Sequence, residues 1–381
     1  MKIATRTGVI ATATVLTLAL AACTASNEEP AATSTPPATP AASDAPATSA
    51  AMSLSGELNG AGASTQQVAM EAWRAKFQNA NPDLTINYDP VGSGGGRTQF
   101  LDGSVGWAGS DAALGEDEYV TAQTRCGVDG AINLPVYVSP IAVAFNLDGI
   151  DSLNLDAATI AMIFDGKITN WSDPAIAADN DGVTLPDAAI TIVHRSDESG
   201  TTKNFTDYLQ KASDGAWPYD ASGDWANDLG ESGQGTSGVV QIITSTTGTI
   251  GYADESQVSD LGVVSVKVGD AFTAPSAEGA AIALEASTPA GTNGPNDLAF
   301  DLDRTTTAAG AYPVMLSSYV IVCQKYDDAA VAANVTSFLE YVASPEGQTA
   351  GAAAAGSAPI SAELSAKIVS ILQGIATASG V

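Results

Sequence analysis

The chain has very few of the residues that usually build metal centres. It contains one histidine, His194, and three cysteines among 381 residues, and no CxxC spacing occurs. Because zinc and most transition metals take their ligands from clusters of these residues, the sequence argues against a metal site. We expect no cofactor of any other kind either.

Basic residues are also scarce. The 14 lysines and arginines stand against 43 acidic residues, which gives a formal net charge of −29. A surface of this charge keeps a protein soluble and repels nucleic acids and anionic membrane surfaces. We therefore expect no nucleic-acid partner.

The N-terminal apolar run, GVIATATVLTLALAA at residues 8–22, is too short to span a bilayer. Lys2 and Arg6 precede it, and small residues lead from it into Cys23. This pattern predicts a secretory signal over residues 1–23. Its end resembles a bacterial lipobox, whose cysteine is lipidated and becomes the mature N-terminus. We expect an extracytoplasmic protein, lipid-anchored through Cys23 to the outer face of the cell membrane; a cytoplasmic anchor helix is the alternative, and its flanks do not fit.

Residues 24–53 lack aromatic side chains and consist mainly of Ala, Thr, Ser and Pro. Such a segment cannot bury enough apolar surface to offset the entropy lost on ordering. We predict a disordered tether between the anchor and the globular body. Two cysteines remain in that body, Cys126 and Cys323. Outside the cell such a pair more often forms a disulfide than two free thiols, and both states stay open here.

The remaining residues, about 330, are enough for two domains. They alternate short apolar runs with helical periodicity, which predicts an α/β protein. The predicted strands and helices are listed by range: strands at 84–89, 141–146, 190–194 and 319–323, and helices at 65–80, 330–343 and 362–374.

Three predicted strand-to-helix junctions are rich in Gly, Ser and Thr. They are GAGAST at 60–65, GSGGGRTQF at 92–100 and SGTTKNF at 199–205, and a fourth run, GWAGSDAAL at 106–114, contains Asp111. The first N–H groups of a helix lack backbone partners and carry a partial positive charge, so they favour anions. Ser and Thr also cap ordinary helices, and Asp111 could be such a cap. Three junctions together with an arginine indicate an anion site.

The run HRSDESGTT at 194–202 allows two enzymatic alternatives, and neither fits. A serine hydrolase would need His194 as the base for Ser199, but alternation along a strand points His194 and Arg195 to opposite faces. No G-x-S-x-G motif surrounds that serine. A nucleotide loop would need a Gly-Lys-Ser/Thr ending, which GSGGGR lacks.

A binding site for a tetrahedral oxyanion fits the same residues better. Arg195 offers a planar fork of donors for two oxygens, and Asp197 lies on the same side of the chain, where it can hold that guanidinium. With Arg195 as the single cation of the site, hydroxyls and backbone N–H groups would supply the other donors. Such a site suits a protein that must release its ligand.

These motifs resemble the substrate-binding lipoprotein of the phosphate ABC transporter. The resemblance runs in the family's order over about 60–255, through GAGAST, GSGGGRTQF, GWAGSDAAL, IFDGKITNWSDPAI, HRSDESGTTKNF and TGTIGYAD. It implies a two-lobed, Venus-flytrap α/β fold with a mixed sheet in each lobe. Lobe 1 would comprise 54–138 and 316–381, and lobe 2 would comprise 139–315, with hinges near 136–142 and 312–318.

The resemblance also implies the ligand set and the function. The implied function is high-affinity binding of inorganic phosphate and its delivery to the ABC transporter permease, without enzymatic activity. A phosphatase on the same scaffold and a binder of another oxyanion, such as sulfate or molybdate, are the alternatives; the acceptor-only Asp111 argues against the latter. Asp197 would be the partner of the arginine, and Cys126 and Cys323 would lie in the same lobe. The implied phosphate ligands are Ser64, Thr65, Ser93, Asp111, Arg195, Ser199, Gly200 and Thr201.

The sequence departs from the family pattern at two positions. Glu198 replaces the usual glycine, and we expect it in an exposed loop with little consequence. Thr65 replaces the usual aromatic residue, so we expect a more polar wall in the site.

Overall fold

The computed structural model describes residues 53–381, and this part of the chain alternates strands and helices as the sequence predicts. The predicted signal segment, Cys23 and the tether up to residue 52 lie outside the described residues. The strands are β1 Gly56–Gly62, β2 Leu84–Asp89, β3 Trp107–Ser110, β4 Ala131–Phe145, β5 Ser152–Leu155, β6 Thr191–Arg195, β7 Glu231–Gly233, β8 Thr249–Asp254, β9 Gly262–Val268, β10 Ala271–Thr273, β11 Thr288–Pro289, β12 Phe300–Asp301 and β13 Met315–Cys323. The α-helices are α1 Gln67–Ala80, α2 Ser93–Leu101, α3 Glu116–Cys126, α4 Ala157–Phe164, α5 Pro174–Ala178, α6 Gly200–Ala212, α7 Gly235–Ser245, α8 Ala277–Glu285, α9 Ala329–Ala343, α10 Pro345–Ala355 and α11 Ala362–Ala378, and the 3-10 helices are η1 Ser64–Gln66 and η2 Glu255–Gln257.

Most predicted elements are confirmed, and the differences concern where they begin or end. The strand expected at 141–146 is only the last part of β4, which is buried along all 15 of its residues. Pro135 and Pro140 interrupt the earlier part of its apolar run. Because proline is unusual inside a strand, the sequence pattern does not predict the first part of β4. The strand expected at 319–323 likewise begins four residues earlier, at Met315.

Eleven of the strands form two groups that share β4, and β11 and β12 pair with each other in a separate two-stranded sheet. In the first group the order is β2-β1-β3-β13-β4, with β1 parallel to β2 and β3, and β13 antiparallel to β3 and β4. In the second group β4 pairs with β8 and β9, β6 lies between β8 and β7, and β5 and β10 flank β9. The change of partner falls between Pro140, which pairs with β13, and Ile141, which pairs with β8. We call the two groups with their helices the first half and the second half.

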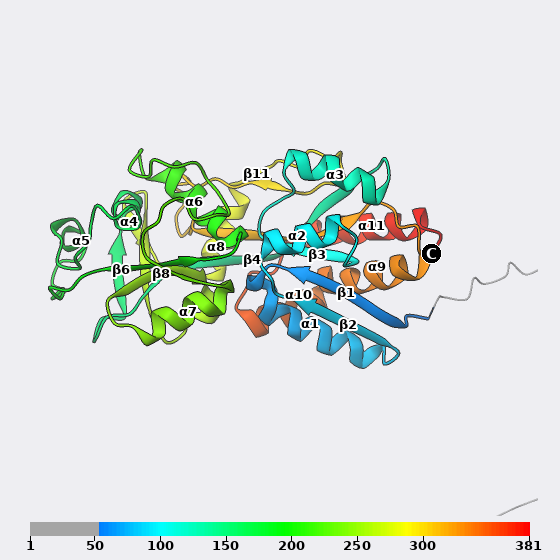
Figure 1. Cartoon of the computed structure of the whole chain (residues 1–381), viewed down its shortest axis with the longest axis horizontal. Helices are drawn as coiled ribbons and strands as arrows, with labels where there is room; N and C mark the ends of the chain where they lie inside the picture. The colour runs from blue at the N-terminus through cyan, green and yellow to red at the C-terminus, as the bar shows by residue number, and fades with distance from the viewer. Residues whose placement is uncertain (1–52) are drawn as a thin grey trace, which may run out of the picture. The chain divides into compact units, whose positions relative to one another are not determined.

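Helices cover both groups of strands. In the first half α2 packs on β1 and β3, α1 packs on β2 and α10, and α9 packs on β1 and α11. In the second half α7 packs on β6, β7 and β8, and α4 packs on α6. Figure 1 shows these two sets of helices on either side, with the long β4 running from one to the other. The fold is therefore a mixed α/β fold in which β4 connects two layered halves.

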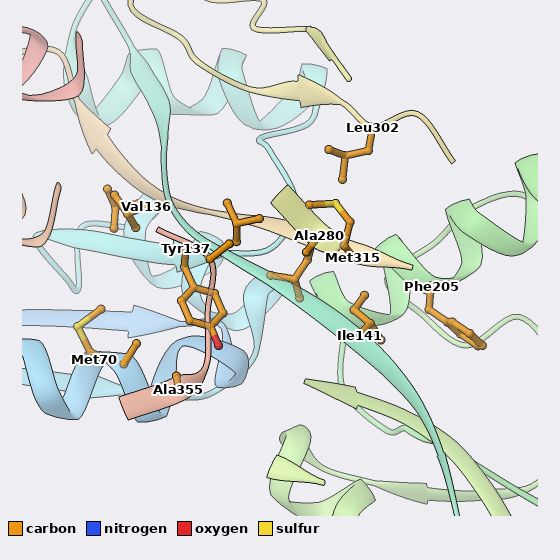
Figure 2. Packing of buried hydrophobic residues seen from close by; sticks show 14 of the residues in the cluster. Met70, Val136, Tyr137, Ile141, Phe205, Ala280, Leu302, Met315 and Ala355 are labelled. Atoms are coloured by element: carbon orange, nitrogen blue, oxygen red, sulfur yellow. The ribbon is translucent and has the colours of Figure 1, made fainter. Parts of the chain in front are cut away.

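The apolar core continues along β4 from one half to the other. Val136, Tyr137 and Ile141 lie on this strand, and each is at most 1% exposed. Met315 of β13 and Phe205 of α6 belong to the same buried cluster. Figure 2 shows these side chains following β4 across the junction between the halves. The strand that links the halves is therefore buried on both faces.

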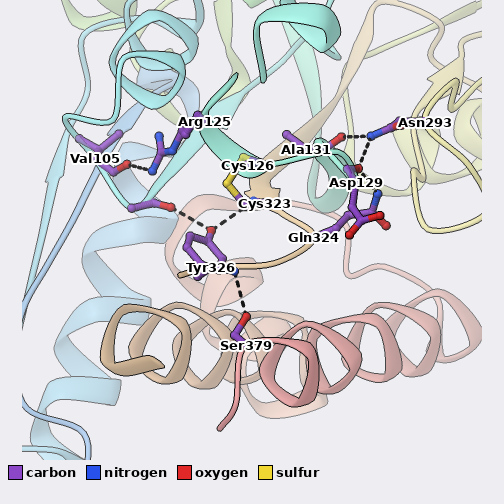
Figure 3. Close-up of a disulfide and its surroundings, with 11 residues drawn as sticks. Val105, Arg125, Cys126, Asp129, Ala131, Asn293, Cys323, Gln324, Tyr326 and Ser379 are labelled. Atoms are coloured by element: carbon purple, nitrogen blue, oxygen red, sulfur yellow. Dashed lines mark hydrogen bonds between the residues drawn. A yellow bond between two sulfur atoms is a disulfide. The ribbon is translucent and has the colours of Figure 1, made fainter. Parts of the chain in front are cut away.

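The predicted disulfide is present. Cys126 at the end of α3 is bonded to Cys323 at the end of β13, with Cα atoms 5.1 Å apart and a sequence separation of 197. Figure 3 shows the bond beside Arg125 and Tyr326. Both cysteines belong to the first half, so the bond does not cross between the halves.

No helix among residues 53–381 is both long and apolar enough to cross a membrane.

Candidate functional site

The predicted strand-to-helix junctions meet where the two halves face each other. β1 leads into η1, β3 leads to Asp111, and β6 leads into α6. Helix α2 begins at Ser93 after Gly92, whose φ of 94° is a backbone conformation that favours glycine. Helix α6 begins after Ser199, whose hydroxyl accepts a hydrogen bond from the Thr202 N–H at 3.2 Å. All eight predicted ligand residues are buried. Six of them lie at helix starts, whereas Arg195 ends β6 and Asp111 follows β3.

Asp111 lies at the centre of these junctions and is only 3% exposed. Its Oδ1 accepts hydrogen bonds from Thr65 Oγ1 at 2.7 Å and from Ser318 Oγ at 2.6 Å. Its Oδ2 accepts from Thr201 Oγ1 at 3.2 Å, and its backbone N–H donates to Ser93 Oγ at 3.1 Å. Burial raises the pKa of Asp111, against the hydroxyl donors and Arg195, which favour the ionised form. Three of the other predicted residues, Thr65, Ser93 and Thr201, thus form hydrogen bonds with Asp111.

Arg195 is held by the predicted ion pair. Its Nε and Nη2 donate to Asp197 Oδ1 and Oδ2 at 2.8 and 2.5 Å, and its Nη1 donates to Thr201 Oγ1 at 3.4 Å. The Gly235 N–H donates to the same Asp197 Oδ1 at 3.0 Å. Burial alone would raise the pKa of Asp197, but Arg195 and this N–H outweigh burial and lower it. The side edge of the guanidinium is therefore occupied by Asp197, while the end edge, formed by Nη1 and Nη2, is directed toward Thr201.

Gly200 allows the start of α6 to approach the first half. A Cβ atom added at Gly200 would lie 2.5 Å from Ser93 Oγ and 2.7 Å from Asp111 Cβ. Any side chain there would push α6 away from both residues. The glycine of the SGTT run is thus required by this close approach between the two halves.

Ser64 makes its contacts with a residue that the sequence analysis missed. Its Oγ lies 2.9 Å from Thr236 Oγ1 and accepts from the Thr236 N–H at 3.1 Å. Thr236 stands in the first turn of α7, after the run SGQG at 232–235. This is a further Gly- and Ser-rich junction of the same kind, so the signal was present in the sequence.

Two more residues at the site are absent from the predicted ligand set, although Asn204 lies within the SGTTKNF run. Ser318 lies in the middle of β13, accepts from Gln66 Nε2 at 2.7 Å and donates to Asp111. Asn204, one turn into α6, donates from Nδ2 to the backbone carbonyl of Asp111 at 2.6 Å and to that of Gly200 at 2.9 Å. Only the fold brings β13 to Asp111.

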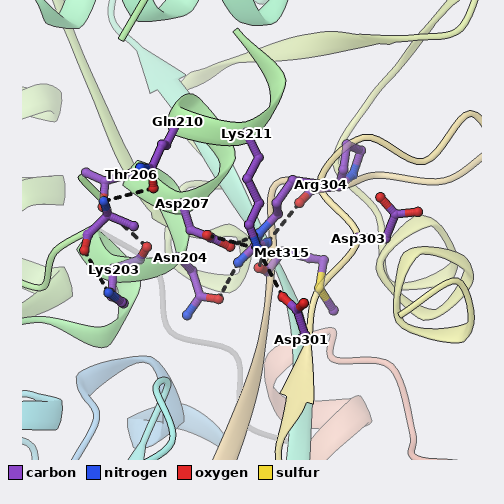
Figure 4. A network of polar contacts seen from close by, with 12 residues as sticks. Lys203, Asn204, Thr206, Asp207, Gln210, Lys211, Asp301, Asp303, Arg304 and Met315 are labelled. Carbon is purple, nitrogen blue, oxygen red and sulfur yellow. Dashed lines mark hydrogen bonds and ion pairs between the residues drawn. The ribbon is translucent and has the colours of Figure 1, made fainter. Parts of the chain in front are cut away.

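A second buried guanidinium, that of Arg304, contacts Asn204 of the site. Arg304, 2% exposed, donates to the carbonyls of Pro313 and Met315 and to Asp207 Oδ2, at 2.9, 2.7 and 2.8 Å. Its Nη2 donates to Asn204 Oδ1 at 2.5 Å. Figure 4 shows Arg304 between α6 and the chain that enters β13. Arg304 thus contacts Asn204 and none of the predicted ligand residues, so it does not contradict the prediction of Arg195 as the single cation of the site.

Glu198 differs from the expectation of an exposed loop residue. Its carboxylate Oε1 accepts from Arg97 Nη2 at 3.1 Å, and its side chain is only 33% exposed. The prediction is wrong because α2 of the first half packs over this loop. Thr65 matches its expectation of a polar wall, since its buried hydroxyl donates to Asp111.

His194 lies on the opposite side from Arg195, as strand alternation predicts. Its ring stacks on Trp225 with centroids 4.9 Å apart, and its Nδ1 lies 2.9 Å from the Arg195 carbonyl oxygen. Burial lowers the pKa of His194. No histidine reaches the Ser199 hydroxyl, because His194 is the only one in the chain. Within residues 53–381 no group of three or more His, Cys, Asp or Glu side chains could hold a metal ion.

Comparisons with known proteins agree with this geometry. The PBP superfamily domain matches residues 31–346. The phosphate-binding protein PstS 3 of Mycobacterium tuberculosis is 39% identical over 289 residues, which cover 74% of this chain and 77% of the relative. PstS 2 of the same organism is 35% identical over 327 residues, which cover 84% of this chain and 87% of the relative.

The fold is also found among solved structures. A high-affinity periplasmic phosphate-binding protein, PfluDING, was solved with bound phosphate and aligns with a TM-score of 0.67 at 22% identity. The alignment covers 83% of this chain and 93% of that one. This likeness confirms the predicted fold class. From the extent and identity of these matches, the chain belongs to the PBP superfamily and, within it, to the family of PstS phosphate-binding proteins.

Proposed function

We propose that this protein binds inorganic phosphate outside the cytoplasm and delivers it to the permease of an ABC transporter. One observation carries the proposal: the starts of two helices and a 3-10 helix, Arg195 and Asp111 meet in one buried cluster between the two halves. The comparisons support it, because relatives over most of the chain are named phosphate-binding proteins.

The donors suit a tetrahedral dianion. The end edge of Arg195 supplies two charged N–H groups, and serine hydroxyls and backbone N–H groups at the helix starts supply neutral ones. The proposed ligands are Ser64, Thr65, Ser93, Asp111, Arg195, Ser199, Gly200 and Thr201, with Asp197 orienting the arginine.

Asp111 gives the site its selectivity. An ionised carboxylate has about four lone-pair positions and no proton to donate. Three hydroxyls, of Thr65, Ser318 and Thr201, already donate to it. One acceptor position remains for a proton on phosphate, which carries one or two protons near neutral pH. Sulfate carries none, so its oxygens would face the Asp111 oxygen without a proton between them, and binding would be opposed.

The two halves act as a clamp in this proposal. Thr201 and Asn204 of the second half contact Asp111 of the first, and Thr236 contacts Ser64 in the same manner. A ligand held by both halves stabilises the closed arrangement, in which all contacts form together. The lobes would be 54–138 with 316–381, and 139–315. The change of strand partner at Pro140 and Ile141 lies within the proposed hinge near 136–142, and the other hinge lies near 312–318.

The lipid anchor at Cys23 completes the proposal and rests on the sequence alone. It would hold the protein at the outer face of the membrane, near the permease, through the tether of residues 24–53. No specific observation favours a phosphatase, because the Ser199 hydroxyl caps α6 and has no base beside it.

Calorimetric titration tests the proposal. Phosphate, sulfate and molybdate would each be titrated into the soluble form that lacks residues 1–52, since residues 51–381 form a compact unit by themselves. We expect one phosphate per protein and no heat from sulfate at millimolar concentration. The absence of a phosphate signal, or equal binding of sulfate, would overturn the proposal.

A further inference from the structure

The Glu198 side chain occupies a narrow space between the two halves. A Cβ atom added at Gly94, in the first turn of α2, would lie 1.8 Å from Glu198 Oε2. A Cβ atom added at Gly223, in the loop after α6, would lie 2.1 Å from Glu198 Oε1. The Gly94 N–H also donates to the Glu198 carbonyl oxygen at 3.3 Å. Two glycines, one from each half, thus leave just enough room for this side chain.

Arg97 is fixed in the first half and reaches Glu198 from there. Its Nε donates to Glu118 Oε1 at 2.8 Å and its Nη1 donates to Ser110 Oγ at 3.1 Å, and both partners belong to the first half. Its Nη2 donates to Glu198 Oε1 at 3.1 Å, across the junction. The Arg97 side chain is only 10% exposed, so this pair is better shielded from water than a surface ion pair. Of the three contacts, only the one to Glu198 must break when the halves separate.

We propose that the Glu198–Arg97 pair is a latch that holds the closed arrangement and slows the release of phosphate. The inference rests on the proposed function, and it assigns Glu198 and Arg97 as positioning residues, because neither touches the ligand. The latch strengthens the closed state without adding any contact to phosphate. Its effect therefore falls on the dissociation rate rather than on the encounter with the ligand.

The charge of Glu198 alone would have the opposite effect. A carboxylate near an anion site repels phosphate, so removal of this charge would strengthen binding if no latch existed. In addition, Glu198 Oε2 is buried and has no hydrogen-bond partner among the residues that the structure describes, which opposes burial of this side chain. The contact with Arg97 must outweigh both effects for Glu198 to lie where it does. Removal of the Glu198 charge should therefore weaken phosphate binding if the pair is a latch and strengthen it if Glu198 acts only by repulsion.

Two variants of Glu198 separate the contact from the charge. Glu198→Gln removes the charge, whereas Glu198→Asp keeps the charge and shortens the side chain by one methylene, so that it no longer reaches Arg97. Glu118→Gln is the matched control, because it removes the other carboxylate that binds Arg97 but does not lie across the junction. The measurement is the release of radiolabelled phosphate from the full-length protein after a chase with unlabelled phosphate, at low and high sodium chloride.

We expect both Glu198 variants to release phosphate about three- to tenfold faster than the wild type. A partly shielded ion pair contributes about 1 kcal/mol, and about 1.4 kcal/mol corresponds to a tenfold change in rate. The Glu118→Gln control should stay within about twofold. High salt should speed release from the wild type and reduce its difference from the variants. Release from Glu198→Asp at the wild-type rate, or slower release from Glu198→Gln, would overturn the latch while phosphate binding stands. Failure of the wild type to retain phosphate would instead overturn the proposed function, and the latch with it.

Discussion

Replacement of Arg195 by alanine should reduce phosphate affinity by at least two orders of magnitude. Arg195 is 3% exposed, and Asp197 holds its side edge through two hydrogen bonds. Apart from the 3.4 Å contact of Nη1 with Thr201 Oγ1, this leaves the end edge, with its two N–H groups, for the ligand. The guanidinium is thus oriented before phosphate arrives, and little entropy is lost when the contacts form.

The magnitude follows from these two contacts. Hydrogen bonds to charged groups contribute about 1.5–3 kcal/mol each, so two contribute about 3 kcal/mol at the lower end. At about 1.4 kcal/mol per tenfold, this corresponds to roughly a hundredfold change in Kd. The loss should be larger than this minimum, because Arg195→Ala also leaves the Asp197 carboxylate near the ligand without its cation. Arg195→Lys keeps the charge but not the fork, so we expect an intermediate loss of about tenfold.

Titration calorimetry on the folded variants would measure these values. Arg125→Ala is the control, because Arg125 lies over the Phe100 ring and donates to the Val105 carbonyl beside the disulfide. That variant should bind phosphate within about twofold of the wild type. Circular dichroism must first show that each variant is folded. An unchanged Kd for a folded Arg195→Ala protein would mean that the site lies elsewhere.

Three further predictions concern selectivity and stability. Sulfate should compete with phosphate more strongly in Asp111→Asn than in the wild type. In the wild type the competition by sulfate should increase as the pH falls, because a protonated Asp111 can donate a hydrogen bond to sulfate. Competition that is equally weak in both proteins at all pH values would contradict this role of Asp111. Asp254 is buried, and burial raises its pKa from 3.8 to about 7. Because the folded state keeps this proton to higher pH than the unfolded chain does, stability is full below about pH 3.8 and falls as the pH rises to about 7, by on the order of 4 kcal/mol. Asp254→Asn should therefore gain in melting temperature relative to the wild type between pH 5 and pH 8, and parallel curves for the two proteins would refute this. Reduction of the Cys126–Cys323 disulfide should lower the free energy of unfolding by on the order of 5 kcal/mol, because the bond closes a long loop in the unfolded chain. Denaturant unfolding with and without reductant measures this difference, and coincident unfolding curves would contradict it.

The helix starts that form the site could be predicted from the sequence because their causes are local. Ser199 caps α6 through the N–H of Thr202, three residues away, and Gly92 supplies the positive-φ backbone before α2. The opposite directions of His194 and Arg195 follow from strand alternation alone. The ion pair of Arg195 with Asp197 spans two residues, and it too could be predicted before the fold was known.

The sequence did not show which distant residues complete the site. Ser318 is 207 residues from Asp111, and Thr236 is 172 residues from Ser64. A serine in the middle of a buried strand carries no pattern that marks a function, because its neighbours on the adjacent strand are set by register. Glu198 makes a contact with Arg97 that could not be predicted from the sequence either. Its loop is polar, and only the packing of α2 over that loop turns the residue into a partner of Arg97.

Local sequence patterns are enough to predict the α/β class and the helix starts that can hold an anion, because capping, alternation and glycine conformations depend on a few adjacent residues. The tertiary structure alone decided that these starts meet at Asp111. That meeting depends on β4 changing its partner from β13 to β8 at Pro140 and Ile141. Strand pairing over long separations is fixed by the burial of whole sheets, and no local pattern specifies it.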